Sequence, residues 1–534
     1  MITFSIAIVL LILGYLVYGA IVEKIFGTDK DRKTPCYTCT DGVDYIPMKT
    51  WKVYLIQFLN IAGTGPIFGA IQGILFGPAA YLWIVFGCIF GGAVHDFLSG
   101  MISMRENGAS LPELVGKELG DKVRFVMRLF SLGLMIMVGA VFVTTPAGLL
   151  SSMTANWGFF GTPLFWSILI FTYYILATLL PIDALIGRIY PIFGIALLIM
   201  AAGVFGGIFI NSGSMPEITE AFANHHPKDN LPLFPMLFIT IACGAVSGFH
   251  ATQSPMMARC LKNEKYGRRV FYGAMITEGI VALIWAAAAI KFADSLNVEG
   301  DTPYQKLLAI MAPEGKMNPA IVVNSICQTW LGPVGAVLAI LGVVAAPVTS
   351  GDTAFRSARL ITADFLHFDQ STIVKRLILC VPIFVISGIL MSINFDILWR
   401  YFAWANQTLS IFTFWAITVW LARRKKYFYI TLIPALFMTM VCTAYIIIDN
   451  NGLGLPQNVG YIIATAVTAL LLGLFIYHYN KGGNRRTSQG NPFGNTNGQN
   501  AYNQTNNADS NPSSKHKKLF SSDEGEYIEF KEED

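Results

Sequence analysis

The stretch Ile61-Ala62-Gly63-Thr64-Gly65-Pro66-Ile67-Phe68-Gly69 interrupts an apolar segment that runs from about residue 52 to about residue 75. Glycine loses the most conformational entropy in a helix, and proline removes a backbone donor and clashes with the preceding turn. In lipid, each unpaired backbone group is costly unless the break is buried in protein or lines a cavity. The sequence therefore predicts a discontinuous membrane helix at this position.

A second break of the same kind is Gly244-Ala245-Val246-Ser247-Gly248-Phe249-His250, with Pro255 just beyond it. Two interrupted apolar segments in corresponding halves of a chain mark the binding site of many secondary transporters. Backbone N–H groups at the start of a half-helix attract anions such as carboxylates. We therefore expect a site for amino acids, short peptides or a keto acid. The residues expected to line it are Gly63, Thr64, Gly65, Ser247, Gly248 and His250.

The composition places most of the chain in a bilayer, since 54% of the residues are hydrophobic and only 13% are charged. About 13 apolar segments are long enough to cross the hydrocarbon core. They lie near 2–22, 53–75, 79–102, 126–150, 163–180, 189–211, 233–251, 270–291, 334–352, 373–393, 396–421, 428–448 and 459–478. Lysine and arginine concentrate in alternate loops, which predicts an external N-terminus and a cytoplasmic C-terminus.

The two breaks open two units of five spans that run in opposite directions, which is the arrangement of an inverted repeat. The predicted all-α polytopic fold is similar to the leucine-transporter-like (LeuT-like) fold. Residues 1–50 would form a first helix and a cytoplasmic loop, 51–211 the first repeat, and 232–422 the second repeat with an external loop at 292–333. Residues 427–480 would add two helices, and the polar residues 481–534 would form a disordered cytoplasmic tail.

Ionisable side chains within spans are candidates for function, because they are costly to place in the membrane. Asp96, Glu278 and Asp352 are candidates for proton handling or gating. The structural alternatives are a tether from the His95-Asp96 pair to a loop, a hydrogen bond from Glu278 to a neighbouring helix, and an ion pair between Asp352 and Arg356.

Asn406 and Gln407 are candidates for substrate contact, and the alternative is a hydrogen bond between helices. His250 has a similar alternative, which is to cap the unwound segment. In the LeuT-like scheme, adjacent hydroxyls on the eighth core helix and carbonyls of the first broken helix hold a sodium ion. Thr349 and Ser350, with the carbonyl of Gly63, match that position. The expected coupling ion is therefore Na⁺ or H⁺.

Cys36 and Cys39 have CxxC spacing but no second pair nearby. They are either a redox pair, half of a metal site, or two reduced cysteines in a loop, and the last is the simplest interpretation.

Several motifs occur in the order typical of one transporter family. They are Thr34-Pro35, Asp41-Gly42-Val43-Asp44-Tyr45-Ile46-Pro47, Ile61-Ala62-Gly63-Thr64-Gly65-Pro66, Gly92-Ala93-Val94-His95-Asp96-Phe97, Val246-Ser247-Gly248-Phe249-His250-Ala251, Tyr272-Gly273-Ala274-Met275 and Ala405-Asn406-Gln407. The chain thus resembles the carbon starvation protein A (CstA) family, within the amino acid–polyamine–organocation superfamily. The resemblance implies a prokaryotic inner-membrane transporter for peptides or pyruvate with a coupling ion. Gln57-Phe58 replaces the family's paired histidines, so no histidine role is carried over there.

The expected function is ion-coupled import of small carboxylate-bearing nutrients by alternating access. The alternatives are a nutrient sensor with a transporter-like fold, which signals through the tail, and an amino acid transporter. We expect no enzymatic activity, since no nucleophile–base pair or phosphate loop is found. The expected partners are a small-molecule substrate and the lipid bilayer, with no cofactor and no nucleic acid.

Overall fold

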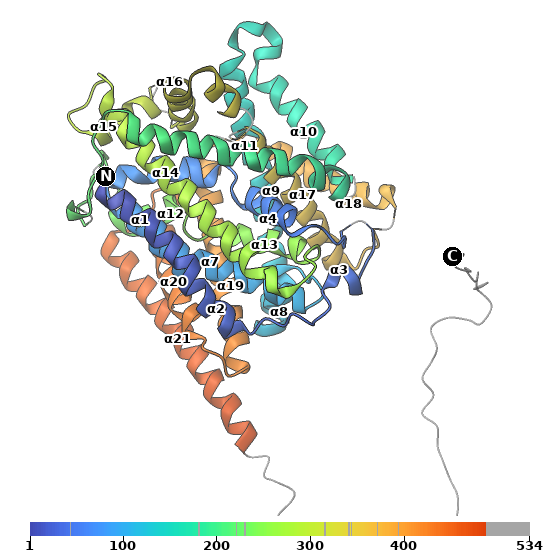
Figure 1. The fold of residues 1–534 in the computed structure, drawn as a ribbon. Helices are drawn as coiled ribbons and strands as arrows, with labels where there is room; N and C mark the ends of the chain where they lie inside the picture. The colour runs from blue at the N-terminus through green and yellow to red at the C-terminus, as the bar shows by residue number, and fades with distance from the viewer. Residues whose placement is uncertain are drawn as a thin grey trace, which may run out of the picture. The chain divides into compact units, whose positions relative to one another are not determined.

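The computed structural model describes residues 1–487 except 43, 180–181, 221, 229–230, 314, 316, 340–341, 343, 371 and 394. Every element in this part of the chain is a helix, and one isolated β-bridge joins Met48 and Leu261 (Figure 1). Met1–Lys481 forms a compact unit. Most of the predicted tail, residues 488–534, lies outside the described residues.

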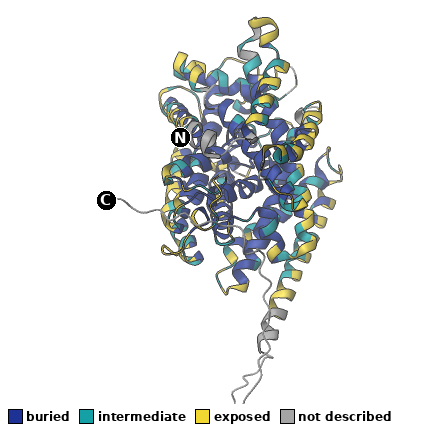
Figure 2. Cartoon of the chain, turned by 90° about the vertical axis from the view of Figure 1, so that its right-hand side faces the viewer, coloured by how far each residue is buried: buried dark blue, intermediate teal, exposed yellow. Residues whose placement is uncertain are grey.

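The described helices are those of a multi-pass membrane protein. Eight are long and apolar enough to cross a membrane, or nine if one bent pair counts as a single span. The eight are Ile2–Phe26, Ala79–Arg105, Asp121–Ser151, Tyr190–Ile210, Glu264–Ser295, Ile373–Leu390, Tyr429–Ile448 and Gln457–Asn480. The all-α class is thus confirmed, whereas the count of 13 spans remains a prediction. Figure 2 shows buried residues inside the bundle and exposed ones at its periphery, as expected for helices that face lipid.

The first break occurs where the sequence predicts it. Helix α4 (Thr50–Ile61) ends, and a short helical turn η2 (Gly65–Gly69) begins the next helical segment. The two parts, Thr50–Ile61 and Gly65–Phe76, are bent by 52°. α5 (Ala70–Gly73) and η3 (Ile74–Phe76) complete the second part.

The second break is also present. Helix α12 (Leu233–Thr240) ends before the break, and α13 (Gly248–Ala258) begins after it. His250 therefore lies in the first turn of α13, beyond the unwound residues. α13 contacts α4, α7 (Ala93–Arg105) and α19 (Phe395–Arg423) in the middle of the bundle (Figure 1).

One predicted boundary is wrong. The sequence places Asp352 at the end of a span over 334–352, but α17 runs from Ala345 to Leu366 and has Asp352 in its interior. Residues 334–339 of that predicted span belong instead to α16 (Pro319–Ala339), which begins within the predicted external loop at 292–333. α17 packs along α9 (Asp121–Met153), but its polar side chains are buried against other helices. Ser350 donates to Leu59 of α4, for example, and Asp352 accepts from Tyr190. Hydropathy misses α17 because so many of its buried side chains are polar.

The remaining helices complete the bundle around the breaks. They are α1 (Ile2–Leu13), η1 (Gly14–Tyr18), α2 (Gly19–Phe26), α3 (Pro35–Thr38), α6 (Ala79–Leu82), η4 (Trp83–Gly92), α8 (Leu111–Leu119), η5 (Ala155–Gly161), α10 (Pro163–Leu179), α11 (Ile182–Ile210), η6 (Ile218–Glu220), η7 (Glu264–Tyr266), η8 (Arg268–Tyr272), α14 (Gly273–Ser295), α15 (Pro303–Met311), α18 (Ile373–Leu390), α20 (Tyr429–Ile448) and α21 (Gln457–Thr487).

Candidate functional site

The two breaks pack against each other without space for a side chain between them. A Cβ atom on Gly65 would lie 2.3 Å from the Sγ atom of Cys243. A Cβ atom on Gly69 would lie 2.8 Å from the backbone oxygen of Thr240. The glycines of the first break therefore serve two purposes, since they interrupt the helix and admit the second break at close range.

Helix α19 holds both halves of the second broken helix. The side-chain oxygen of Asn406 accepts hydrogen bonds from the Ser247 hydroxyl at 3.0 Å and from the Phe249 backbone N–H at 2.7 Å. The Gln407 amide donates to the backbone oxygen of Phe238 in α12 at 2.5 Å. These are the helix–helix hydrogen bonds that the sequence offered as the alternative to substrate contact.

The start of α13 is consequently closed to a substrate carboxylate in this conformation. Asn406 already accepts from the Phe249 N–H, and a Cβ atom on Gly248 would lie 2.4 Å from the Asn406 backbone oxygen. Gly248 thus packs against α19. A role for Ser247, Gly248, Asn406 and Gln407 at the substrate remains a prediction.

A chain of four buried ionisable side chains lies beside the second break. Nδ1 of His95 is 2.8 Å from one carboxylate oxygen of Asp96, and Nδ1 of His250 is 2.9 Å from the other. Nε2 of His250 is 3.5 Å from Oε2 of Glu278. All four side chains have 0% exposure. The chain joins three helices, because His95 and Asp96 belong to α7, His250 to α13 and Glu278 to α14.

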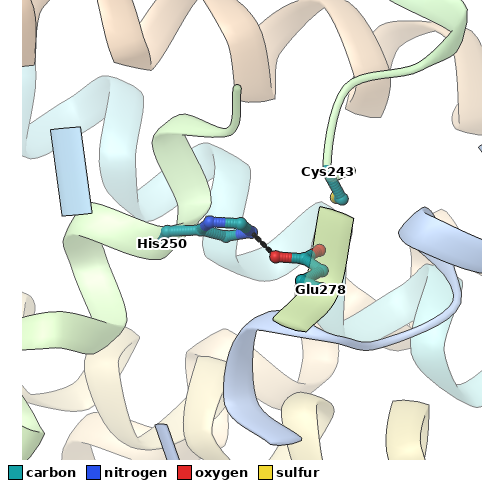
Figure 3. A group of neighbouring side chains, drawn as sticks. All are labelled: Cys243, His250 and Glu278. Carbon is teal, nitrogen blue, oxygen red and sulfur yellow. Dashed lines mark ion pairs between the residues drawn. The ribbon is translucent and has the colours of Figure 1, made fainter. Parts of the chain in front are cut away.

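The Glu278 end of this chain is incompletely satisfied. Both carboxylate oxygens of Glu278 and Nε2 of His250 are buried without a hydrogen-bond partner. Figure 3 shows the His250 ring directed at the Glu278 carboxylate, with Cys243 above Glu278 in this view. A buried charge without partners is costly, so this point of the protein is suited to take up a proton or another ligand.

Cys243 makes this end a three-residue group. The Sγ atom of Cys243, a ring nitrogen of His250 and a carboxylate oxygen of Glu278 lie within 4.8 Å of one another. A transition metal would draw such atoms to about 2.0–2.3 Å from itself. The same space can hold a proton shared between the imidazole and the carboxylate.

Thr349 and Ser350, which are predicted to bind the coupling cation, lie beside the first break, but their hydroxyls donate to different helices. The Ser350 hydroxyl donates to the backbone oxygen of Leu59 at 3.0 Å, and it lies 3.4 Å from where a Cβ on Gly63 would be. The Thr349 hydroxyl donates to Ala346 within its own helix at 2.8 Å. Ser350 therefore faces the break, whereas the Thr349 hydroxyl is used locally.

Two polar side chains at the first break have buried atoms without a partner. They are the hydroxyl of Thr64 and both amide atoms of Asn60. Thr64 is a predicted substrate residue, and Asn60 was missed by the sequence reasoning. The available signal was an amide one residue before Ile61 in an otherwise apolar span.

Asp352 is part of a separate group. The Tyr190 hydroxyl of α11 donates to Oδ2 of Asp352 at 2.5 Å and to the Thr349 backbone oxygen at 3.2 Å. Arg356 forms an ion pair with Asp44, with Nη1 3.5 Å from Oδ1. Of the three predicted proton carriers, the structure thus connects Asp96 and Glu278 through His250 and gives Asp352 a partner on α11.

The CxxC pair has no disulfide in the structure. Cys36 is buried and Cys39 is half-buried, and both are free thiols. The role of the pair remains a prediction.

Comparison with known proteins identifies relatives along most of the chain. The family model "Carbon starvation protein CstA" matches residues 1–162 and 151–308. An "Uncharacterized membrane protein" of Haemophilus influenzae is 45% identical over 55% of this chain and 91% of its own length. The "Peptide transporter CstA" of Bacillus subtilis is 26% identical over 87% of this chain and 93% of its own length. The "Pyruvate/proton symporter BtsT" of Escherichia coli is 29% identical over 53% of this chain and 48% of its own length.

Proposed function

The chain belongs to the carbon starvation protein CstA family, and from this premise we propose that it is an ion-coupled secondary transporter for peptides or pyruvate. The names of the Bacillus and Escherichia relatives support this substrate range. The observation that carries the proposal is the contact of two broken helices beside the buried chain from His95 to Glu278.

The proposal includes the membrane arrangement. The protein would lie in the prokaryotic inner membrane with an external N-terminus, about 13 spans and a LeuT-like inverted repeat. The close contact of the two breaks supports this repeat, since the first helices of the two units meet at the centre of such a fold. The proposal also includes membership of the amino acid–polyamine–organocation superfamily, which the same contact supports.

The substrate would bind where the breaks separate. Gly63, Thr64 and Gly65 would contribute from the first break, and Ser247 and Gly248 from the second. The unpartnered atoms of Thr64 and Asn60 support this position, because a bound polar substrate would satisfy them.

The coupling ion would be a proton held between His250 and Glu278. One proton across the 3.5 Å gap converts an unpartnered carboxylate into a hydrogen-bonded pair. His250 belongs to the helix that starts at the second break, whereas Glu278 belongs to the neighbouring α14. Movement of α13 would therefore alter this gap and with it the affinity for the proton, which is the coupling that a symporter needs.

A sodium ion is the alternative for coupling, and the position of Ser350 supports it. The Ser350 hydroxyl and the Leu59 carbonyl already converge next to Gly63. Hard cations prefer such oxygen ligands. Thr349 could join them only if its hydroxyl turned away from Ala346.

Uptake into proteoliposomes tests these proposals. Labelled pyruvate and labelled dialanine are each supplied with a proton gradient alone or a sodium gradient alone. We expect proton-driven uptake that Glu278→Gln and His250→Asn reduce at least tenfold. Glu299→Gln, which changes an exposed glutamate, is the matched control.

Other results would redirect the proposal. Sodium-driven uptake that Ser350→Ala abolishes would contradict proton coupling and favour the sodium site. Specific binding of a substrate without flux under either gradient would favour the sensor. Deletion of residues 481–534 would then abolish signalling in cells that carry the protein.

A further inference from the structure

A cavity that was not predicted from the sequence is lined by the part of the first broken helix that follows its break and by the part of the second that precedes its break. Its volume is about 230 Å³. Phe68 and Gln72 line it from the first broken helix, and Met236 and Thr240 line it from the second. A molecule in this cavity would touch both broken helices at once, so its binding would respond to their movement.

The described lining of the cavity has an excess of one positive charge. Its charged residues are Lys228, Arg400 and Asp449. His226 also lines the cavity, and burial together with the nearby Lys228 lowers its pKa to about 4. His226 is therefore neutral at physiological pH, and the cavity as described favours an anion.

The one carboxylate in the described lining is already engaged. Oδ1 of Asp449 accepts hydrogen bonds from the Asn451 backbone N–H at 2.8 Å and from its amide at 3.1 Å. Oδ2 of Asp449 is 3.9 Å from Nη1 of Arg400. This long ion pair leaves donors of the Arg400 guanidinium for a ligand, and a guanidinium binds a carboxylate with two parallel hydrogen bonds.

We propose that this cavity binds the carboxylate of a small monoanionic substrate, such as a 2-oxo monocarboxylate, in preference to a zwitterionic peptide. Arg400 and Lys228 would bind the carboxylate, while Phe68 and Met236 would contact the apolar end. The ammonium group of a peptide would meet two cations and an aspartate that is already engaged, so a peptide would be rejected by repulsion. The volume fits the same class, since it is below the 300–1,000 Å³ or so of pockets for larger ligands.

This inference rests on the proposed function and narrows its substrate: the cavity would bind the substrate before the breaks separate to admit it. It is tested with purified full-length protein. Equilibrium binding of labelled pyruvate is measured in detergent, and uptake is measured in proteoliposomes. Dialanine and methyl pyruvate, which has no charge, are the competitors. Lys228→Gln removes a charge from an exposed side chain, and Arg400→Lys keeps the charge but loses the planar guanidinium. Lys306→Gln, which removes a charge from a half-buried lysine outside the cavity lining, is the control.

The expected results concern affinity. Lys228→Gln should raise the Kd and the KM for pyruvate at least fivefold with less than a twofold change in Vmax, Arg400→Lys should raise both, and Lys306→Gln should change neither. Methyl pyruvate and dialanine should compete at least tenfold less well than unlabelled pyruvate.

Failure of this inference and failure of the proposed transport function would look different. Uptake of pyruvate with the same KM in Lys228→Gln and wild type, or stronger competition by dialanine, would overturn the assignment of the cavity and leave transport intact. Binding that depends on Lys228 but is not followed by flux would overturn transport and leave the cavity as a binding site.

Discussion

A single methyl group on Gly65 should test whether the two breaks meet as closely as described. In Gly65→Ala, the new Cβ would lie 2.3 Å from Sγ and 2.5 Å from Cβ of Cys243. Carbon atoms in ordinary contact are about 3.5–4.0 Å apart, so the breaks would have to separate by about 1 Å. Overpacking of this kind costs about 1–3 kcal/mol. We therefore expect Gly65→Ala to lower the free energy of unfolding by about that amount.

The assay is reversible unfolding in mixed micelles, followed by tryptophan fluorescence. A second substitution, Cys243→Gly, removes both clashing atoms, so Gly65→Ala should cost at least 1 kcal/mol or so less in the Cys243→Gly background than in the wild type. Gly133→Ala is the matched control, because a Cβ atom there would have nothing within 4 Å, and it should not destabilise the protein. Equal losses from Gly65→Ala in both backgrounds would refute the contact between the breaks.

Three further predictions follow from the buried polar groups. Asn406→Ala should destabilise the protein by about 1–3 kcal/mol, because the Phe249 N–H loses its acceptor inside the bundle; Asn406→Asp keeps an acceptor, and an equal loss in both variants would count against this reason. Glu278→Gln should abolish proton-driven uptake but retain exchange of internal for external substrate, which moves no net proton; loss of both activities would show that Glu278 is needed for more than the proton. Tyr190→Phe should alter transport less than His250→Asn, because Tyr190 bonds the separate Asp352 group; a larger effect in uptake assays would move proton handling to Asp352.

The sequence alone determined the features that depend on local chemistry. The membrane class follows from apolar composition. The first break follows from Gly63, Gly65 and Pro66, since the entropic cost of glycine in a helix and the missing N–H of proline need no tertiary partner. The second break and the family follow from equally local patterns. The sequence also marked Asp96, His250 and Glu278 individually, because an ionisable residue in an apolar span is conspicuous by itself.

Only the tertiary structure decided how these residues combine. His250 meets Asp96 and Glu278 across positions far apart in the chain, so no spacing rule could pair them. The hydrogen bond from the Phe249 N–H to Asn406 also joins positions far apart in the chain, so it could not be predicted either. Asp352 was placed at the end of a span because hydropathy cannot recognise a helix whose polar side chains are buried against its neighbours. The charge of the cavity at Lys228 and Arg400 arises where a loop and α19 converge, and such convergence depends on packing between distant segments.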